Sequence, residues 1–288
     1  MTRFVVALVW ALALGSGVAQ SILGPAALMA APEDDGHGRY TVDYELEEGW
    51  TVSKWLAEEG VDPTHVFSLT FDMFNLKALP ADLALLSNLE HLAVYVAEDE
   101  GARDVKGFEV LFKLPQLRQL RLQRLRLDSF GQMQVPAVVL HLTSLRELAI
   151  VGYQMGPLFP RIGDFQALER LNVSYGGLSS VPEALASLTT LRELGLKGNA
   201  ELRALPAGMA NLPDLVALNI SGTGITHLPE APGAFPALRK LILGSIGSAS
   251  VTHLPAWATQ RVWDKLDCRN SALQALPTCY HLSHVGSA

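Results

Sequence analysis

The sequence predicts an α/β solenoid in which every coil of the chain contributes one short strand and one short helical turn. The first observation is a recurring frame, leucine-x-x-leucine-x-leucine, of which Leu191, Leu194 and Leu196 form a clear copy. The second is its period, because nine first anchors follow one another at positions 66, 89, 117, 145, 168, 191, 215, 238 and 263. Repetition at this interval indicates stacked supersecondary units that share one continuous core.

The frame itself indicates where the strands lie. Its last two leucines stand two residues apart, so in a strand both side chains point to the same, inward face. We therefore predict nine strands near residues 68–72, 91–95, 119–123, 147–151, 170–174, 193–197, 217–221, 240–244 and 265–269. Further along each coil, proline often precedes apolar residues at three-residue spacing, as at Pro182, Leu185 and Leu188. That spacing favours a short helical turn on the outer side of the coil.

This pattern resembles the leucine-rich repeat family, in its bacterial-type, 23-residue form with a leucine–proline pair, over about residues 66 to 279. The resemblance implies a right-handed horseshoe with one parallel sheet on its concave face and short helical turns on its convex side. It also implies a binding surface for proteins. The family places asparagine eight residues past the first anchor, where its amide bonds the backbone between coils, and here only Asn199 matches.

The N-terminal residues predict export. A single charge, at Arg3, precedes an apolar run, and small residues ending at Ala19 offer a cleavage site, so residues 1–19 are interpreted as a signal peptide. The uncharged run continues to Ala31, which leaves an uncleaved membrane anchor as the alternative. Either interpretation places the repeats outside the cytoplasm, in the periplasm or the medium. A membrane is an expected partner only if the run is uncleaved.

Both ends of the repeat array require a cap, because an open solenoid exposes apolar surface there. Residues 20–64 form an acidic N-terminal segment that we expect to cap the first coil with a short helix from Ser53 to Gly60. Residues 65–288 are predicted to hold about nine repeats and a C-terminal cap. Cys268 and Cys279 lie in the last repeat, where an exported protein could join them in a disulfide, and two unlinked buried thiols are the alternative.

Charge and motifs argue against several functions. From Pro63 onward the chain holds 19 acidic and 19 basic side chains, a balance that does not favour nucleic acid. The sequence has no phosphate-binding loop and no nucleophile elbow, so we predict neither an enzyme nor a cofactor. His227 and His253 share a Thr-His-Leu-Pro setting, which we interpret as a surface feature copied by the repeat. Glu147, Arg170 and Glu193 are interpreted as a cross-strand ion-pair ladder.

A candidate binding surface follows from two features that meet at one edge of the predicted solenoid. Lys113, Arg118, Arg121, Arg124 and Arg126 form a basic cluster without an intervening acid. Repeats two and three each carry five additional residues, around 98–107 and 128–134, and insertions gathered on one face often mark a binding region. With the outward strand positions, the predicted partner-binding residues are Asp72, Tyr95, Arg121, Gln123, Arg124, Asn172, Tyr175, Lys197 and Asn219.

Two alternatives remain open at this point. The basic cluster could be neutralised locally by acids of the preceding repeat, Glu98, Asp99, Glu100 and Asp104. The chain as a whole could be a structural or adhesive component of the cell envelope that uses the repeats as a stable scaffold. The function predicted first is a non-catalytic module that binds a protein or another macromolecule through its concave face and insertion edge.

Overall fold

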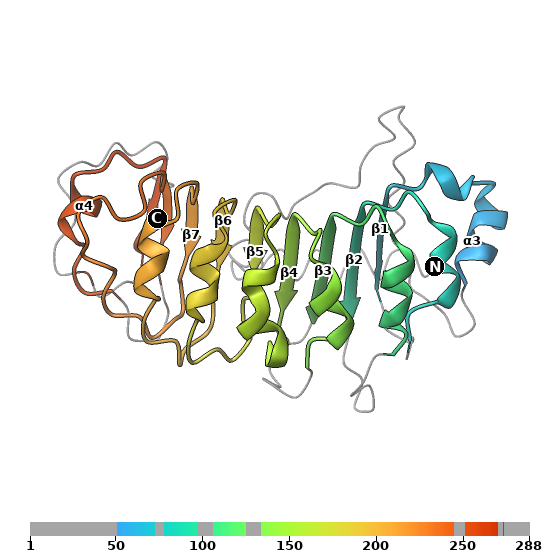
Figure 1. Cartoon of the computed structure of the whole chain (residues 1–288), viewed down its shortest axis with the longest axis horizontal. Helices are drawn as coiled ribbons and strands as arrows, with labels where there is room; N and C mark the ends of the chain where they lie inside the picture. Colours follow the sequence, from blue (N-terminus) through green and yellow to red (C-terminus); the bar gives the residue numbers. More distant parts are fainter. Residues whose placement is uncertain are drawn as a thin grey trace, which may run out of the picture.

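The computed structural model describes residues 51–72, 78–96, 106–124, 134–244, 251–269 and 273. Within them, nine strands pair in chain order into one parallel sheet (Figure 1). The strands are β1 (Ser68–Asp72), β2 (His91–Val96), β3 (Gln119–Arg124), β4 (Glu147–Val151), β5 (Arg170–Asn172), β6 (Glu193–Gly195), β7 (Ala217–Asn219), β8 (Lys240–Ile242) and β9 (Lys265–Asp267). The predicted solenoid with a single parallel sheet is confirmed.

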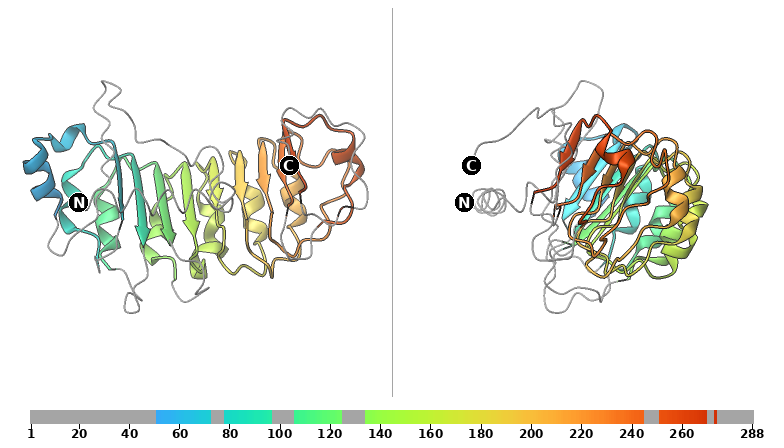
Figure 2. Two further views of the ribbon diagram at one scale, coloured as in Figure 1. Left: turned by 180° about the vertical axis from the view of Figure 1, so that it is seen from behind. Right: turned by 90° about the vertical axis from the view of Figure 1, so that its left-hand side faces the viewer.

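Short helices form a second layer behind the sheet, as the end-on view in Figure 2 shows. Within the described residues the 3-10 helices are η1 (Pro63–His65), η2 (Ala81–Leu85), η3 (Phe108–Lys113), η4 (Ala137–His141), η5 (Gly156–Asp164), η6 (Glu183–Ser187) and η7 (Ala207–Asn211). Pro80, Pro136, Pro182 and Pro206 stand at the N-caps of four of them. Proline suits a helix start because its φ is already fixed and its missing N–H would have no partner within the helix. The predicted convex turns are therefore confirmed.

The core lies between the sheet and the helical layer. Inward pairs such as Leu171 with Val173 and Leu194 with Leu196 have at most 2 % of their surface exposed. The strand register places equivalent residues of successive coils side by side, so leucine packs on leucine along the whole stack, as Leu171 on Leu194 and Leu194 on Leu218. Each coil thus buries its inward face only because its neighbours supply the rest of the core.

From β5 onward the strands are three residues long, which is shorter than the five predicted. Side-chain hydrogen bonds explain the early end of two of them. Asn172 Oδ1 accepts from Ser174 N at 3.1 Å, and Asn219 Oδ1 accepts from Ser221 N at 3.0 Å. Hydrogen bonds of this kind, from a side-chain oxygen to a backbone N–H two residues later, form a local turn that competes with regular strand pairing. The backbone bonds between coils nevertheless continue beyond the assigned strand, as Val173 N donates to Gly195 O at 2.8 Å.

Asn199 joins adjacent coils as the family pattern implies. Its Oδ1 accepts from the N–H groups of Gly176 and Leu178, each at 3.0 Å, and its Nδ2 donates to the carbonyls of Val173 and Leu196 at 2.9 and 2.7 Å. The side chain is fully buried. One asparagine therefore satisfies four buried backbone groups that would otherwise lack partners.

The N-terminal helix α3 (Val52–Glu59) packs its buried Val52 and Trp55 against the core at the first coil. It begins two residues earlier than predicted, because Thr51 and not Ser53 is the N-cap and accepts from Lys54 N. Ser53 instead donates from both N and Oγ to Asp82 Oδ2, at 2.8 and 2.7 Å. The helix ends at Gly60 with φ 66°, as predicted.

Near the other end, Arg261 holds the last described coils together. Its guanidinium lies 5.1 Å from the ring centroid of Trp257 and 5.8 Å from that of Trp263. It also donates to the carbonyls of Ala234, Phe235 and Leu238. Desolvation by burial lowers its pKa. This cluster lies beside α4 (Ala256–Thr259) and fixes the loop before β8.

Several predictions concern residues outside the described parts of the chain. Residues 1–50 hold the predicted signal peptide or anchor, and Cys279 is the second member of the predicted disulfide. Cys268 is half-buried just after β9. Among the described residues, no helix combines the length and the hydropathy that crossing a bilayer requires.

Candidate functional site on the concave face

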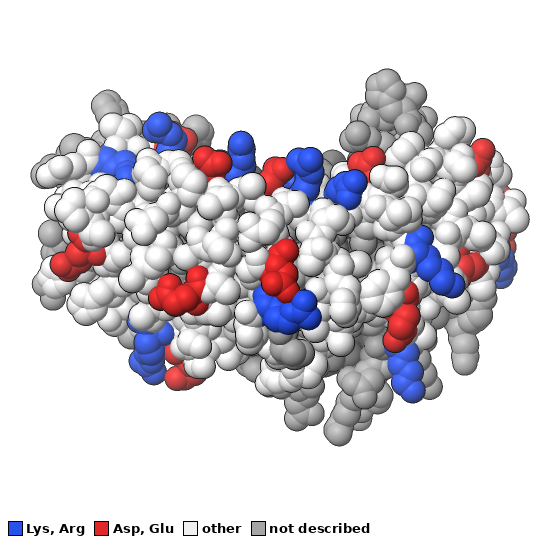
Figure 3. Space-filling view, viewed as in Figure 1, with Lys and Arg blue, Asp and Glu red and all other residues white. Residues whose placement is uncertain are grey.

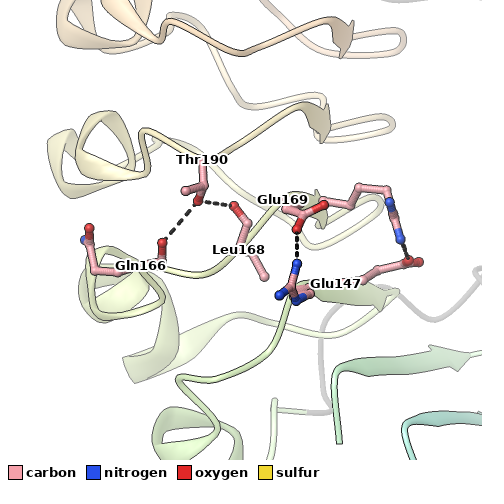
Figure 4. Close-up of polar contacts among 7 residues, drawn as sticks. Glu147, Gln166, Leu168, Glu169 and Thr190 are labelled. Carbon is pink, nitrogen blue, oxygen red and sulfur yellow. Dashed lines mark hydrogen bonds and ion pairs between the residues drawn. The ribbon is translucent and has the colours of Figure 1, made fainter.

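Three charged residues from β3, β4 and β5 form a network on the face of the sheet that points away from the helices. Glu147 Oε2 accepts from Arg170 Nε at 2.9 Å and lies 2.8 Å from Arg170 Nη2 (Figure 4). Glu147 Oε1 lies 3.7 Å from Arg121 Nη2. One carboxylate thus serves two guanidinium groups, and Arg121 has the weaker contact. The predicted pairing of Glu147 with Arg170 is confirmed, whereas Glu193, on β6, is exposed.

A second pair lies next to this network at the edge where the strands begin. Arg146 Nη1 donates to Glu169 Oε1 at 2.7 Å, as Figure 4 shows. In the same region Thr190 Oγ1 donates to the carbonyls of Gln166 and Leu168, at 3.1 and 2.8 Å, and so joins one coil to the next (Figure 4). These contacts fix the strand starts, so the charged side chains of the concave face are held by a rigid frame.

Arg124 does not lie on the binding surface predicted for it. Its side chain is 2 % exposed and donates from Nη1 to Gly152 O at 3.0 Å. The reason is the period of the strand: β3 extends to residue 124, which has the same parity as the inward Leu120 and Leu122. Arg124 approaches Tyr153, the residue that stands in the asparagine column, and burial raises the pKa of that tyrosine.

Asn172 and Asn219 are the last residues of β5 and β7, and their amides have fixed orientations. Each Oδ1 accepts from the N–H of a serine two residues later, and also from its Oγ, at 2.6 Å for Ser174 and 2.7 Å for Ser221. Among the described residues neither Nδ2 has a hydrogen-bond partner. Both amides therefore direct N–H donors away from the sheet, a feature that the Asn-x-Ser pattern at 172 and 219 could have indicated in the sequence.

Tyr175 adopts a backbone conformation that is unusual for its residue type. Its φ is 55°, and the same place in the neighbouring repeats is taken by Gly152, Gly198 and Gly222, all with positive φ. The ring lies so close to Gly198 that a Cβ there would collide with it. Lys197 Nζ is 5.8 Å from the ring centroid, and burial lowers the pKa of this lysine and raises that of Tyr175. A half-buried aromatic ring is thus held beside an ammonium group.

The remaining predicted site residues lie toward the N-terminal strands. Tyr95 and Gln123 are neighbours in the register of β2 and β3, and both are half-buried. Asp72 is the register partner of Tyr95 at the end of β1, and its side chain is outside the described parts. Most residues of the two insertions, and the acids Glu98, Asp99, Glu100 and Asp104, also lie outside them. Neither the insertion edge nor the local neutralisation is therefore tested.

Basic side chains outnumber acidic ones along the described strands. We consider the outward positions of the strands and the residue before each strand, among described side chains. Eight are basic: Arg118, Arg121, Arg146, Arg170, Arg192, Arg239, Lys240 and Lys265, and two more, Lys197 and Arg269, lie just beyond the ends of β6 and β9. Six are acidic: Glu90, Glu147, Glu169, Glu193, Asp264 and Asp267. Figure 3, which views the helical side of the molecule, shows acidic and basic side chains both along the upper margin and scattered below it.

Metal-ligating residues do not gather within the described residues, where no group of three or more histidine, cysteine or acidic side chains could hold an ion. His227 and His253 are exposed, and each ring Nδ1 is hydrogen-bonded to the threonine before it, at 2.8 and 3.0 Å. The repeat thus copies the same local contact, as the sequence pattern predicted.

Comparisons with known proteins bear on the fold. No protein-family model and no curated protein matches the sequence. A leucine-rich repeat protein of Leptospira interrogans is similar in structure, with a TM-score of 0.61 and 18 % identity over 83 % of this chain and 56 % of that one. The chain thus spans about half the length of the Leptospira protein.

Two further structures show weaker likeness. The leucine-rich repeat ectodomain of an Arabidopsis thaliana membrane receptor kinase, in complex with Casparian strip integrity factor 2, has a TM-score of 0.47 and 22 % identity over 73 % of this chain and 25 % of that chain. The leucine-rich repeat domain of the type III effector XopL has a TM-score of 0.41 and 22 % identity over 83 % of this chain and 70 % of that chain.

The nine-stranded parallel sheet, the leucine frame and the Leptospira structure together define the class. The chain has the leucine-rich repeat fold.

Proposed function

We propose that this chain is an exported, non-catalytic module that binds a protein partner through its concave face. The observation that carries the proposal is the arrangement of donors on that face. Arg121, Asn172 and Asn219 are partly accessible on one rigid parallel sheet, and the positive excess lies on the same side. Solenoids use such continuous, shallow faces to bind macromolecules, whereas small substrates are usually enclosed in deeper pockets.

The proposed location is outside the cytoplasm, in the periplasm or the medium. The support for it is the sequence of residues 1–19, with one basic residue, an apolar stretch and small residues before the proposed cleavage point. Residues 20–64 and 65–288 are proposed as the acidic capping segment and the repeat domain. A disulfide between Cys268 and Cys279 would suit such a location.

Affinity capture distinguishes this function from that of a structural scaffold. The immobilised full chain is incubated with an envelope extract of the source cells, in parallel with Arg121→Glu and with Lys113→Glu. Lys113 belongs to the basic cluster of the sequence, but it is exposed on the convex helix η3, away from the concave face, and so serves as a matched control. A binding module retains a protein on the wild type and on the control, and loses it on Arg121→Glu. Retention of nothing, or equal retention by all three, favours the envelope scaffold.

A further inference from the structure

The middle row of the concave face carries a hydrogen-bond donor on every second strand. We define this row as Arg121, Ala149, Asn172, Gly195 and Asn219, which are consecutive partners in the register of β3 to β7. A guanidinium and two carboxamides thus alternate with a residue that has a methyl group and one that has no side chain. The alternation leaves the donors separated from each other across the sheet.

The polar side chains of this row offer hydrogen-bond donors to a ligand. Both asparagines commit their Oδ1 atoms to serine N–H and O–H groups, so their Nδ2 groups face outward. Arg121 has five N–H donors, and its contact with Glu147, at 3.7 Å, is an ion pair longer than a hydrogen bond. A ligand that matches the row must therefore supply acceptors, and the neighbouring positive charge favours acceptors that are carboxylates.

The spacing of the donors selects a ligand conformation. Neighbouring strands lie about 4.8 Å apart, so donors on every second strand recur at about 9.6 Å. A polyproline II helix has three residues per turn and rises about 3.1 Å per residue, so one of its faces recurs at about 9.3 Å. An extended β-strand repeats its faces at about 6.6 Å and does not match.

We propose that the middle row binds an acidic polypeptide segment in the polyproline II conformation, which crosses the strands and presents one carboxylate to each of Arg121, Asn172 and Asn219. This inference rests on the proposed function and specifies the chemistry of the partner. It accounts for the alternation of long and short side chains, because the two residues between successive acids of the ligand pass over Ala149 and Gly195.

Tyr175 adds an independent observation beyond the end of β5, the central strand of the row. It lies three residues after Asn172, in a left-handed conformation that glycine adopts at three equivalent places. A tyrosine there costs conformational energy, and such strain tends to persist at binding sites. Its half-buried ring, supported by Gly198, offers the aromatic surface on which proline-rich segments pack.

The test measures binding of a fluorescent nonapeptide, (Glu-Pro-Pro)₃, to the full chain by fluorescence anisotropy. Its isomer, Glu₃-Pro₆, has the same charge and composition but lacks the three-residue spacing. The proposal predicts that the repeating peptide binds at least about tenfold more tightly than the isomer, since the isomer leaves two donors without a charged acceptor. Equal binding of the two peptides, or binding of neither, overturns the proposal, as does binding of a heparin fragment without the repeating peptide.

Isosteric variants identify the site. Asn172→Asp and Asn219→Asp retain the oxygen that accepts from serine and replace the outward donor with an acceptor. Each is expected to weaken binding of the repeating peptide about tenfold or more without changing the melting temperature. Asn211→Asp adds the same charge at an exposed residue of η7 and should bind as the wild type does.

Unchanged peptide binding by the Asn172→Asp and Asn219→Asp variants overturns the assignment of the row. If these variants also retain the partner found by affinity capture, the proposed function stands and only its assignment to this row fails. If no partner is captured, yet the repeating peptide binds and the variants reduce it, the row is correct and the natural source of the segment lies elsewhere.

Discussion

At the scale of single residues, a few polar side chains determine how the coils join and what they present. Asn199, Asn172 and Asn219 are all asparagines of the repeat frame, yet they have opposite roles. Asn199 is fully buried and uses both ends of its amide to bond backbone groups of adjacent coils. The other two use only the oxygen internally and present the nitrogen to solvent. The position of an asparagine within the frame therefore decides whether its amide bonds the backbone between coils or presents a donor on the concave face.

Replacement of Asn199 by alanine should destabilise the protein strongly. The substitution removes partners from four backbone groups, so we expect the free energy of unfolding to fall by about 3–5 kcal/mol, the upper range for a single substitution. Chemical denaturation of the two proteins measures the difference. Asn211→Ala, at an exposed position of η7, is the control and should change stability by less than about 0.5 kcal/mol. Similar losses in both variants would contradict the assigned role of Asn199.

Arg124 illustrates a limit of prediction at this scale. The sequence places it in a basic cluster, and a cluster of like charges suggests exposure. Its burial follows from the end of β3 and from the carbonyl of Gly152 in the next coil, neither of which the cluster reveals. The outward positions of Arg121 and Asn172 were predicted correctly because strand parity alone determines them.

At the scale of elements, the leucine frame predicts the strands well. The predicted starts of all nine agree with the described ones, because each start is set by the inward leucines. The ends agree less well from β5 onward, since serine N–H groups turn back to asparagine oxygens in β5 and β7. The N-cap of α3 was misplaced by two residues, since Ser53 bonds Asp82 of η2, and a contact with a residue 29 positions away is not visible in a local pattern.

Leu194→Ala tests the packing of a strand against its neighbours. Leu194 on β6 is 2 % exposed and has Leu171 and Leu218 as its register partners. The substitution should reduce the free energy of unfolding by about 2–5 kcal/mol, as for other buried leucines. Leu85 on η2 is 47 % exposed, so Leu85→Ala is a matched control with a clearly smaller effect. An equal effect of the two substitutions in denaturant titrations would be inconsistent with the described core.

Arg261→Ala tests the cluster that fixes the last described coils. The variant loses its donors to three carbonyls and its contact with two indole rings. We expect local loosening, seen as faster hydrogen exchange near Phe235 and Leu238 and as a red shift of tryptophan fluorescence. Exchange near Asn199, in a distant coil, should stay slow. Uniformly faster exchange along the chain would mean that the effect is global instead of local.

At the scale of the whole molecule, the period of the sequence determines the architecture, while the partner depends on surface details that no period encodes. The solenoid, its single sheet and its two layers follow from the repeat. The donors of the middle row can be predicted only partly from the repeat, because the orientation of the Asn172 and Asn219 amides depends on contacts with Ser174 and Ser221.

The proposed export concerns the whole chain and has its own test. Cleavage after Ala19 predicts a mature protein that begins at Gln20. N-terminal sequencing of protein recovered from the periplasm or the medium measures this directly. A chain that retains Met1 and is found in the membrane fraction would favour the N-terminal anchor.

The most direct test of the central claim, that the concave face binds a protein partner, is a titration of the captured partner against the full chain at low and physiological salt. We predict that Arg121→Glu weakens binding about tenfold or more with little change in melting temperature, because the ion pair of Arg121 with Glu147 is long, at 3.7 Å, and Glu147 keeps its closer partner Arg170. Binding to the wild type should also weaken as salt screens charges beyond about 8–10 Å. Equal affinities of wild type and Arg121→Glu for the partner, at both salt concentrations, would contradict the claim.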